Sequence, residues 1–192
     1  MSKSLFKKSL IKKIYLVLSI VTLFISKSYS NNYSLQFDGD DDHVNIPNSE
    51  LLNFTQGEDY SIQLDFKSSF SGQLSSAQGI LAKSHGDFPV NGWQIFITPE
   101  TNNPLLFNAN QGNENGGSYL YGPISSDYND GEWHHIAITY ESNIDQASFY
   151  FDGVMISNFP SHGNLDLTNI GDLKIGTDRG NDSFFNGKID EV

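Results

Sequence analysis

The sequence predicts an all-β fold, and three observations support this prediction. Apolar and polar residues alternate without error from Tyr60 to Lys67, which gives an extended strand one apolar and one polar face. Similar runs, rich in aromatic and β-branched residues, recur from Tyr33 to the end with Gly, Asn and Asp between them. Asp152 and Gly153 stand between two apolar runs, the strongest short-range signal of a β-hairpin. Many short strands without a convincing helix predict a sandwich or a barrel.

About a dozen segments have the composition and alternation of strands, and each is bounded by turn-forming residues. In chain order the expected strands are YSLQF (33–37), HVNIP (43–47), YSIQLDFK (60–67), GILAK (79–83), GWQIFIT (92–98), PLLFNAN (104–110), SYLYG (118–122), EWHHIAITY (132–140), ASFYF (147–151), VMIS (154–157), LKIG (173–176) and FNGKIDEV (185–192). The most regular of them is expected to bury Tyr60, Ile62, Leu64 and Phe66.

Residues 1–30 have the three zones of a secretory signal peptide. A basic stretch, MSKSLFKKSLIKK, precedes twelve apolar residues from Ile14 to Ile25, and the small-residue segment SKSYS follows. Twelve apolar residues fall short of the ~20 that a membrane-spanning helix needs. The expected outcome is cleavage after Ser30, a secreted or cell-surface location, and no membrane insertion of the mature chain.

The mature chain, residues 31–192, is strongly acidic and contains no cysteine. It has 5 basic and 23 acidic side chains, a net charge of −18, which argues against a nucleic-acid partner. Disulfides cannot stabilise it, so its core must be large enough to stand alone. Its length is that of one domain, and no linker interrupts it.

Four segments across the mature chain resemble the laminin-G-like family of concanavalin A-like lectin and glucanase domains. They are SLQFDGDDDHVNIP, YSIQLDFK, DGEWHHIAITYE together with SFYFDGVMIS, and IGTDRGNDSFFNGKIDEV. The resemblance implies a two-sheet antiparallel jelly-roll sandwich, whose concave face and rim loops hold carbohydrate or protein ligands in relatives. In the family the ending GKIDEV runs on into a last strand, whereas this sequence stops at Val192. The domain is therefore interpreted as truncated at its C-terminal end, which would expose a sheet edge.

Two tryptophans and two adjacent histidines are candidates for chemistry. The family pattern favours packing of Trp133 within the fold, while Trp93 could either bury its ring or stack on a sugar. His134 and His135 are neighbours on an expected strand and point to opposite faces, so they cannot bind one metal ion together.

Glycoside hydrolysis needs two carboxylates about 5 to 10 Å apart. Glucanases that share the implied fold place them on one strand as Glu-x-Asp-x-x-Glu, and this pattern does not occur here. The sequence therefore favours a protein that is not an enzyme.

The run from Asp38 to Asp42 is the most acidic segment, and it suggests a structural calcium ion. Calcium takes six to eight oxygen ligands, many of them carboxylates. The first and last strands tend to lie together in such folds, so Asp38, Asp42 and Asp190 are the candidate ligands. The alternative is a solvated turn between two strands.

Ligand binding is expected in rim loops such as 111–121, QGNENGGSYLY, with Asn113, Asn115, Tyr119 and Tyr121 as the candidate residues. A Gly-rich hairpin connection without a ligand is the alternative. The preferred function is a secreted, non-catalytic module that binds a glycan or an extracellular protein, within an adhesin or beside an enzyme domain. A glycoside hydrolase of the same fold and a structural cell-surface spacer remain as alternatives.

Overall fold

The computed structural model describes residues 33–85, 91–111, 117–160, 163–178 and 180–192. The segment expected to be a signal peptide lies outside these residues. Ser34 to Val192 form one compact unit, which contains the predicted β-domain. Among the described residues, no helix has the length and apolar character needed to cross a membrane.

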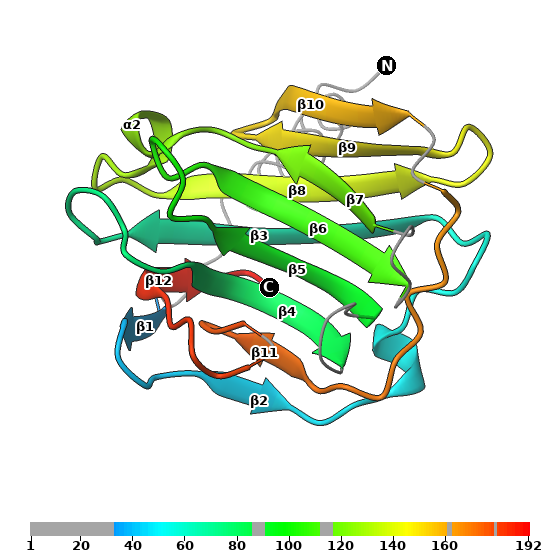
Figure 1. Ribbon diagram of the computed structural model, residues 1–192, viewed down its shortest axis with the longest axis horizontal. Helices are drawn as coiled ribbons and strands as arrows, with labels where there is room; N and C mark the ends of the chain where they lie inside the picture. The colour runs from blue at the N-terminus through cyan, green and yellow to red at the C-terminus, as the bar shows by residue number, and fades with distance from the viewer. Residues whose placement is uncertain (1–32, 86–90, 112–116, 161–162, 179) are drawn as a thin grey trace, which may run out of the picture. The chain divides into compact units, whose positions relative to one another are not determined.

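Twelve strands and two short helical turns make up the described part of the chain (Figure 1). In chain order these elements are β1 (Leu35–Asp38), β2 (Val44–Ile46), η1 (Glu50–Leu52), β3 (Tyr60–Ser68), β4 (Gln78–His85), β5 (Asn91–Ile97), β6 (Leu105–Gln111), β7 (Gly117–Tyr121), α2 (Ser125–Tyr128), β8 (His134–Glu141), β9 (Gln146–Phe151), β10 (Val154–Pro160), β11 (Leu173–Ile175) and β12 (Asn186–Asp190).

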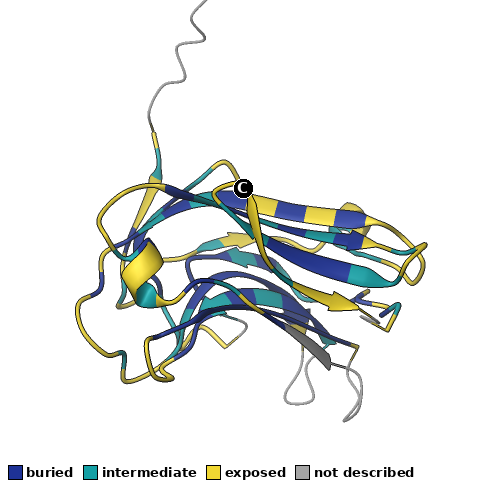
Figure 2. Ribbon diagram, turned by 90° about the horizontal axis from the view of Figure 1, so that it is seen from above, coloured by how far each residue is buried: buried dark blue, intermediate teal, exposed yellow. Residues whose placement is uncertain are grey.

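The strands form two antiparallel sheets of six strands each, which lie one above the other in Figure 2. Sheet A has the order β1-β12-β3-β8-β9-β10, and sheet B has the order β2-β11-β4-β5-β6-β7. The predicted jelly-roll sandwich is therefore confirmed. The expectation that the first and last strands lie together is also confirmed, because β1 pairs with β12.

Alternation along the central strands β3 and β8 of sheet A contributes buried side chains to the core between the sheets. In β3, Tyr60, Ile62, Leu64 and Phe66 are all buried, as the sequence predicted. Figure 2 shows the resulting alternation of buried and exposed bands along the strands. The hairpin predicted at Asp152 and Gly153 is also present, with φ of 47° and 78° at these two residues and β9 paired to β10.

The core has one unusual member, the side chain of Lys83 on β4, which is completely buried. Five oxygen atoms surround its Nζ atom at 2.7 to 3.2 Å. The side-chain oxygens come from Asn48, Asn53 and Asn169, and the backbone oxygens from Asn169 and Gly171. A buried ammonium is tolerated only when such partners replace its water.

The loop before β11 approaches β4 closely enough to supply these oxygens. A Cβ atom at Gly171 would lie 2.2 Å from the backbone oxygen of Ser84, so only glycine permits this approach. Burial lowers the pKa of Lys83, while the nearby Asp172 carboxylate raises it in part. The Lys83 ammonium thus links three segments that are far apart in the sequence.

Replacing Lys83 by Met should lower the free energy of unfolding by about 3 kcal/mol or more, because the surrounding oxygens lose their donor. Chemical denaturation followed by tryptophan fluorescence measures the change. Lys67→Met on the outer face of β3 is the matched control, and it should change stability by only about 0.5 kcal/mol. Equal effects of the two substitutions would contradict the role given to Lys83.

Candidate functional site

The outer face of sheet B carries an unusual group of polar side chains. Ile95 and Ile97 of β5 belong to the core, so the intervening Gln94 points outward. By the same alternation in β6, Phe107 and Ala109 point inward, while Asn108 and Asn110 point outward. Ser84 of β4 completes this group, which we call the amide face: Ser84, Gln94, Asn108 and Asn110.

Strand register brings the members of the amide face together. Gln94 pairs with Asn108, and Asn108 pairs in turn with Tyr119 of β7. One row further, Gly92 lies between Ser84 and Asn110. Side chains directly opposite each other on one face lie about 5 Å apart. The face is therefore continuous across β4, β5 and β6.

An apolar row borders the amide face on one side. It consists of Phe96, Leu106 and Tyr121, which are paired across β5, β6 and β7. Leu106 is buried, Phe96 is half-buried, and Tyr121 is 54% exposed. Two aromatic rings next to a set of amides give the sheet both apolar and hydrogen-bonding surface.

Two polar atoms of the amide face lack a hydrogen-bond partner among the described residues. They are Oε1 of Gln94 and Oγ of Ser84, and both are buried. A buried polar atom without a partner costs about 1 to 3 kcal/mol, so such atoms are uncommon in folded proteins. A hydroxyl group of a bound molecule could satisfy either of them.

The strands that carry this face contain no carboxylate. None of the residues of β4, β5, β6 or β7 is Asp or Glu, although the mature chain has 23 acidic groups. The only lysine of these strands is Lys83, which points into the core. The surface formed by the four strands is therefore uncharged except at His85, at one end of β4.

The ligand residues predicted from the sequence fall partly on this face. Tyr119 and Tyr121 lie in β7 and not in a rim loop, and their positions place them beside Asn108 and Leu106. Asn113 and Asn115 lie outside the described residues. Sequence reasoning missed Gln94, Asn108 and Asn110, although each is a polar residue that alternates with apolar ones in an otherwise apolar strand.

The predicted calcium ligands require one correction. Asp38 and Asp42 do come together, and Asp41 joins them, with one carboxylate oxygen from each lying within 4.8 Å of the others. Asp190 is not part of this group. In the antiparallel ladder Asp38 pairs with Asn186, whereas Asp190 lies at the other end of β12, opposite Asp65 of β3.

Of the two tryptophans, only Trp133 differs from expectation, since burial was one of the two alternatives for Trp93. Trp133, which was expected to pack within the fold, is 42% exposed. Trp93 is buried, and its Nε1 atom has no hydrogen-bond partner among the described residues.

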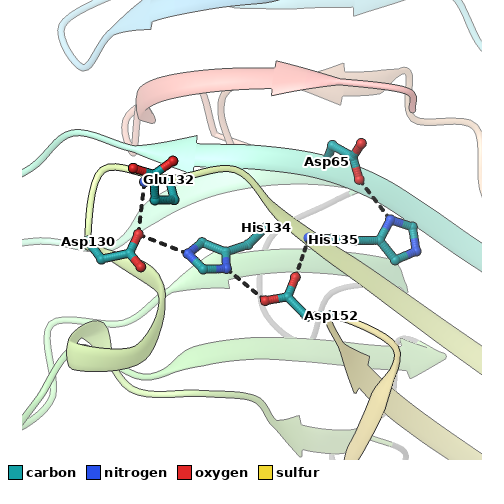
Figure 3. A network of polar contacts seen from close by, with 6 residues as sticks. All are labelled: Asp65, Asp130, Glu132, His134, His135 and Asp152. Carbon is teal, nitrogen blue, oxygen red and sulfur yellow. Dashed lines mark hydrogen bonds and ion pairs between the residues drawn. The ribbon is translucent and has the colours of Figure 1, made fainter.

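His134 and His135 point to opposite faces, as predicted, and each contacts aspartate (Figure 3). His135 Nδ1 lies 2.8 Å from Asp65 on the outer face of sheet A. His134 is buried, and its Nε2 and Nδ1 atoms lie 3.0 Å from Asp130 and 2.9 Å from Asp152. The ring of His134 stacks on Phe151, with centroids 4.8 Å apart.

The geometry around His134 favours the charged imidazolium. A carboxylate oxygen only accepts hydrogen bonds, so both ring nitrogens must carry a proton to bond both aspartates. Burial lowers the pKa of His134, but the bonds to Asp152 and Asp130 outweigh burial and raise it overall. The pKa of Asp130 is lowered, mainly by the backbone N–H of Glu132 and then by His134.

Stability should therefore decrease as the pH rises through the pKa of His134 in the folded protein. Because the pKa is raised in the folded protein, the stabilisation by the imidazolium is complete below about pH 6.5, the pKa of histidine in the unfolded chain. It is lost as the pH rises further. The midpoint of urea unfolding, measured between pH 6 and pH 9, should fall in the wild type. His134→Gln should remove most of this dependence.

His135→Gln is the matched control, since water screens the half-exposed ion pair with Asp65 and little stability is at stake. This variant should retain the pH dependence of the wild type. An unchanged pH dependence in His134→Gln would show that the imidazolium does not stabilise the fold.

Comparisons with known proteins agree with this architecture. A family model described as the concanavalin A-like lectin/glucanases superfamily matches residues 38–192. None of the curated proteins compared with the chain matches it.

Several solved structures have the same fold at low sequence identity. The binding domain of Paraclostridial Mosquitocidal Protein 1 superposes with a TM-score of 0.61 at 15% identity, over 81% of this chain and 38% of that one. The heptameric SAP-like pentraxin from Limulus polyphemus superposes with a TM-score of 0.53 at 13% identity, over 82% of this chain and 73% of the pentraxin chain. The Ruminococcus gnavus IT-sialidase CBM40 bound to alpha2,3 sialyllactose superposes with a TM-score of 0.57 at 14% identity, over 82% of this chain and 88% of the CBM40 chain.

Identities this low establish the fold alone, and the present chain spans well under half of the mosquitocidal protein's chain. The family match covers most of the sequence and nearly all of the β-sandwich. The chain therefore belongs to the concanavalin A-like lectin/glucanase superfamily.

Proposed function

We propose that this chain is a secreted, non-catalytic carbohydrate-binding module that binds an uncharged glycan on the outer face of sheet B. The observation that carries the proposal is the pair of buried, unpartnered oxygens, Gln94 Oε1 and Ser84 Oγ, within the amide face. The likeness to a sialidase module in complex with a sugar agrees with a binding function.

The chemistry of the face suits sugar hydroxyls. Each hydroxyl both donates and accepts, so it can donate to the unpartnered Oε1 of Gln94 or Oγ of Ser84 on a rigid sheet. Phe96 and Tyr121 border these amides and provide ring surface for the apolar side of a sugar. Binding pockets for small molecules combine apolar surface and a few polar groups in this way.

The charge of the face favours an uncharged ligand. A sialylated glycan carries a carboxylate, which is recognised best by arginine or lysine. The strands β4 to β7 contain no arginine, and their single lysine is buried in the core. The surrounding chain, with its net charge of −18, would repel an anion further.

A non-catalytic role agrees with the absence of acidic residues from these strands. Hydrolysis of a glycosidic bond needs a carboxylic acid and a second carboxylate close to it. Neither is available within β4 to β7, where the amide face lies. A module of this kind would serve an adhesin or an enzyme domain on the same polypeptide.

The proposal predicts selective binding on a glycan array that contains neutral and sialylated sugars. The wild type should bind neutral glycans, and Gln94→Ala should weaken binding about tenfold through the loss of one hydrogen bond. Ser84→Ala should have a similar effect, because the Oγ atom of Ser84 is the second unpartnered atom of the amide face.

Gln36→Ala on β1 is the matched control, since it removes the same side chain from sheet A. It should bind as the wild type does. Equal binding by the Gln94 and Gln36 variants would remove the amide face from the site, and exclusive binding of sialylated glycans would refute the uncharged ligand.

We also propose a structural calcium ion, with Asp41 in place of Asp190. Asp38, Asp41 and Asp42 offer three carboxylate oxygens, the type of ligand that calcium prefers, and backbone oxygens and water would supply the rest. Three carboxylates this close repel one another, and a divalent cation would turn this repulsion into attraction.

Calcium should then raise the temperature of thermal unfolding, and a chelator should reverse the effect. An ion that binds only the folded chain adds ~2.7 kcal/mol to the free energy of unfolding when its concentration is one hundred times its Kd. Asp41→Asn should abolish the calcium response, whereas Asp190→Asn should retain it. Thermal unfolding that is identical in calcium and in chelator would eliminate the site.

A further inference from the structure

One edge of sheet A, the strand β10, lacks the charges that usually protect such an edge (Figure 1). Four of its seven residues are large apolar side chains exposed to solvent: Val154 (63%), Met155 (49%), Ile156 (44%) and Phe159 (38%). β10 pairs with β9 on one side, and no strand among the described residues pairs with its other side. Unpaired backbone groups beside exposed apolar side chains form a surface on which a further strand can pair.

The other edges of the two sheets are protected. On the opposite edge of sheet A, β1 ends at Asp38, and residues 40–42 are three further aspartates. The same acidic run precedes β2, an edge strand of sheet B that is only three residues long. Charges and short edge strands both discourage pairing between molecules. The fourth edge, β7, lies against β10, where Ser157 Oγ donates a hydrogen bond to the backbone oxygen of Tyr121 at 2.7 Å.

The region around β10 is uncharged, which indicates the kind of partner that it fits. β7, β9 and β10 contain no Asp, Glu, Lys or Arg, although the mature chain carries 23 acidic groups and a net charge of −18. A basic partner would be attracted to the carboxylates elsewhere on the chain. Two copies of this acidic chain repel each other least where both surfaces are uncharged, because charges more than ~8 Å apart are largely screened at physiological ionic strength. The charge distribution therefore favours a second copy.

The inner side of β10 carries two of the exposed apolar side chains. Phe159 lies opposite Ala147 of β9, which is completely buried, so Phe159 is on the inner side of sheet A. Val154 is on the same side, because it lies opposite Phe151, which packs against the core. Both side chains are nevertheless exposed. β10 therefore presents one apolar residue near each of its ends on the same side.

We propose that β10 pairs antiparallel with β10 of a second copy across a twofold axis, which joins the two sheets A into one continuous sheet. An axis at the middle of the strand puts Val154 opposite Phe159 of the second copy on the inner side. It puts Met155 opposite Asn158 of the second copy on the outer side. A shift by one residue would place inner residues opposite outer ones, so the faces select this register. Each inner apolar residue gains an apolar partner, and the free backbone groups of β10 gain hydrogen bonds.

This pairing is closed at two copies. The register with β9 shifts at Ile156, which makes it the extra residue of a β-bulge, and Pro160 ends the strand. Both features keep the shared ladder short, and each copy uses its open edge, so further copies cannot add there. Because inner residues lie opposite inner residues, both sheets B lie on the same side of the continuous sheet. The two amide faces then point in one direction.

The association state of the purified protein tests the proposal. Sedimentation velocity between about 1 and 100 μM should show a monomer that converts to a dimer as the concentration rises. Ile156→Lys and Ile156→Glu should each weaken association about tenfold or more, because Ile156 lies beside the axis and like charges would meet there. An equimolar mixture of the two variants should associate again, because opposite charges then meet. Circular dichroism verifies that each variant is folded.

Leu51→Lys is the matched control, because it adds the same charge at a residue of η1 that is 93% exposed and lies outside β10. It should dimerise as the wild type does. Amide hydrogen exchange in β10 should slow with rising concentration in the wild type and in this control, but not in Ile156→Lys. A wild type that stays monomeric, a dimer that persists in Ile156→Lys, or a mixture that fails to associate would overturn the proposal. No glycan is present in these measurements, so their outcome is independent of binding at the amide face.

Discussion

The buried ammonium of Lys83 is the interaction on which the position of β4 and of the loops beside it depends. Its oxygen partners Asn48 and Asn53 bracket the turn η1, so the same ammonium fixes this turn beside β4. On the same strand, the residue after Lys83 is Ser84, which faces outward as part of the amide face. A methionine or leucine at position 83 could fill the space but could not bind the surrounding oxygens. The position of β4 therefore depends on one charge whose hydrogen-bond partners are all neutral oxygens.

The two sides of sheet B differ in character. In β5, Gln94 belongs to the amide face, while its neighbour Trp93 points into the core, is buried and stacks on Phe54. Strands that are packed on both sides are held more firmly than strands with one solvent face, because each side restricts the motion of the other. The packing of Trp93 on Phe54 holds β5 from the inside, and a preorganised Gln94 loses less entropy when a ligand binds.

The sequence predicts those features that depend on local patterns. Alternation in β3 and the Asp152-Gly153 turn required only neighbouring residues, so strands, faces and hairpin were correct. The features that the sequence analysis missed or placed wrongly depend on contacts between distant segments. Lysine is seldom buried, and the oxygens that make it possible at Lys83 lie 30 to 88 residues away. Asp190 was placed with Asp38 because the two strands were correctly expected to be adjacent. Their antiparallel register, which the sequence does not specify, puts the two carboxylates at opposite ends of the ladder.

Two internal cations link distant segments of this cysteine-free, acidic protein. Lys83 joins the loops beside β4 and β11, and His134 joins the turn at Asp130 to the hairpin turn at Asp152. Both cations are buried. Neutral oxygens surround Lys83, whereas carboxylate oxygens of two aspartates contact His134. They differ in their response to pH. Burial lowers the pKa of Lys83 from a high ordinary value, whereas that of His134 is raised from a value near neutrality. Above neutral pH the imidazolium is lost first, and a neutral ring can donate to only one of its two aspartates. The contact between the start of β8 and the turn at Asp152 therefore loosens while the contacts of Lys83 remain, so alkaline unfolding should begin at the β9–β10 hairpin and reach β4 later.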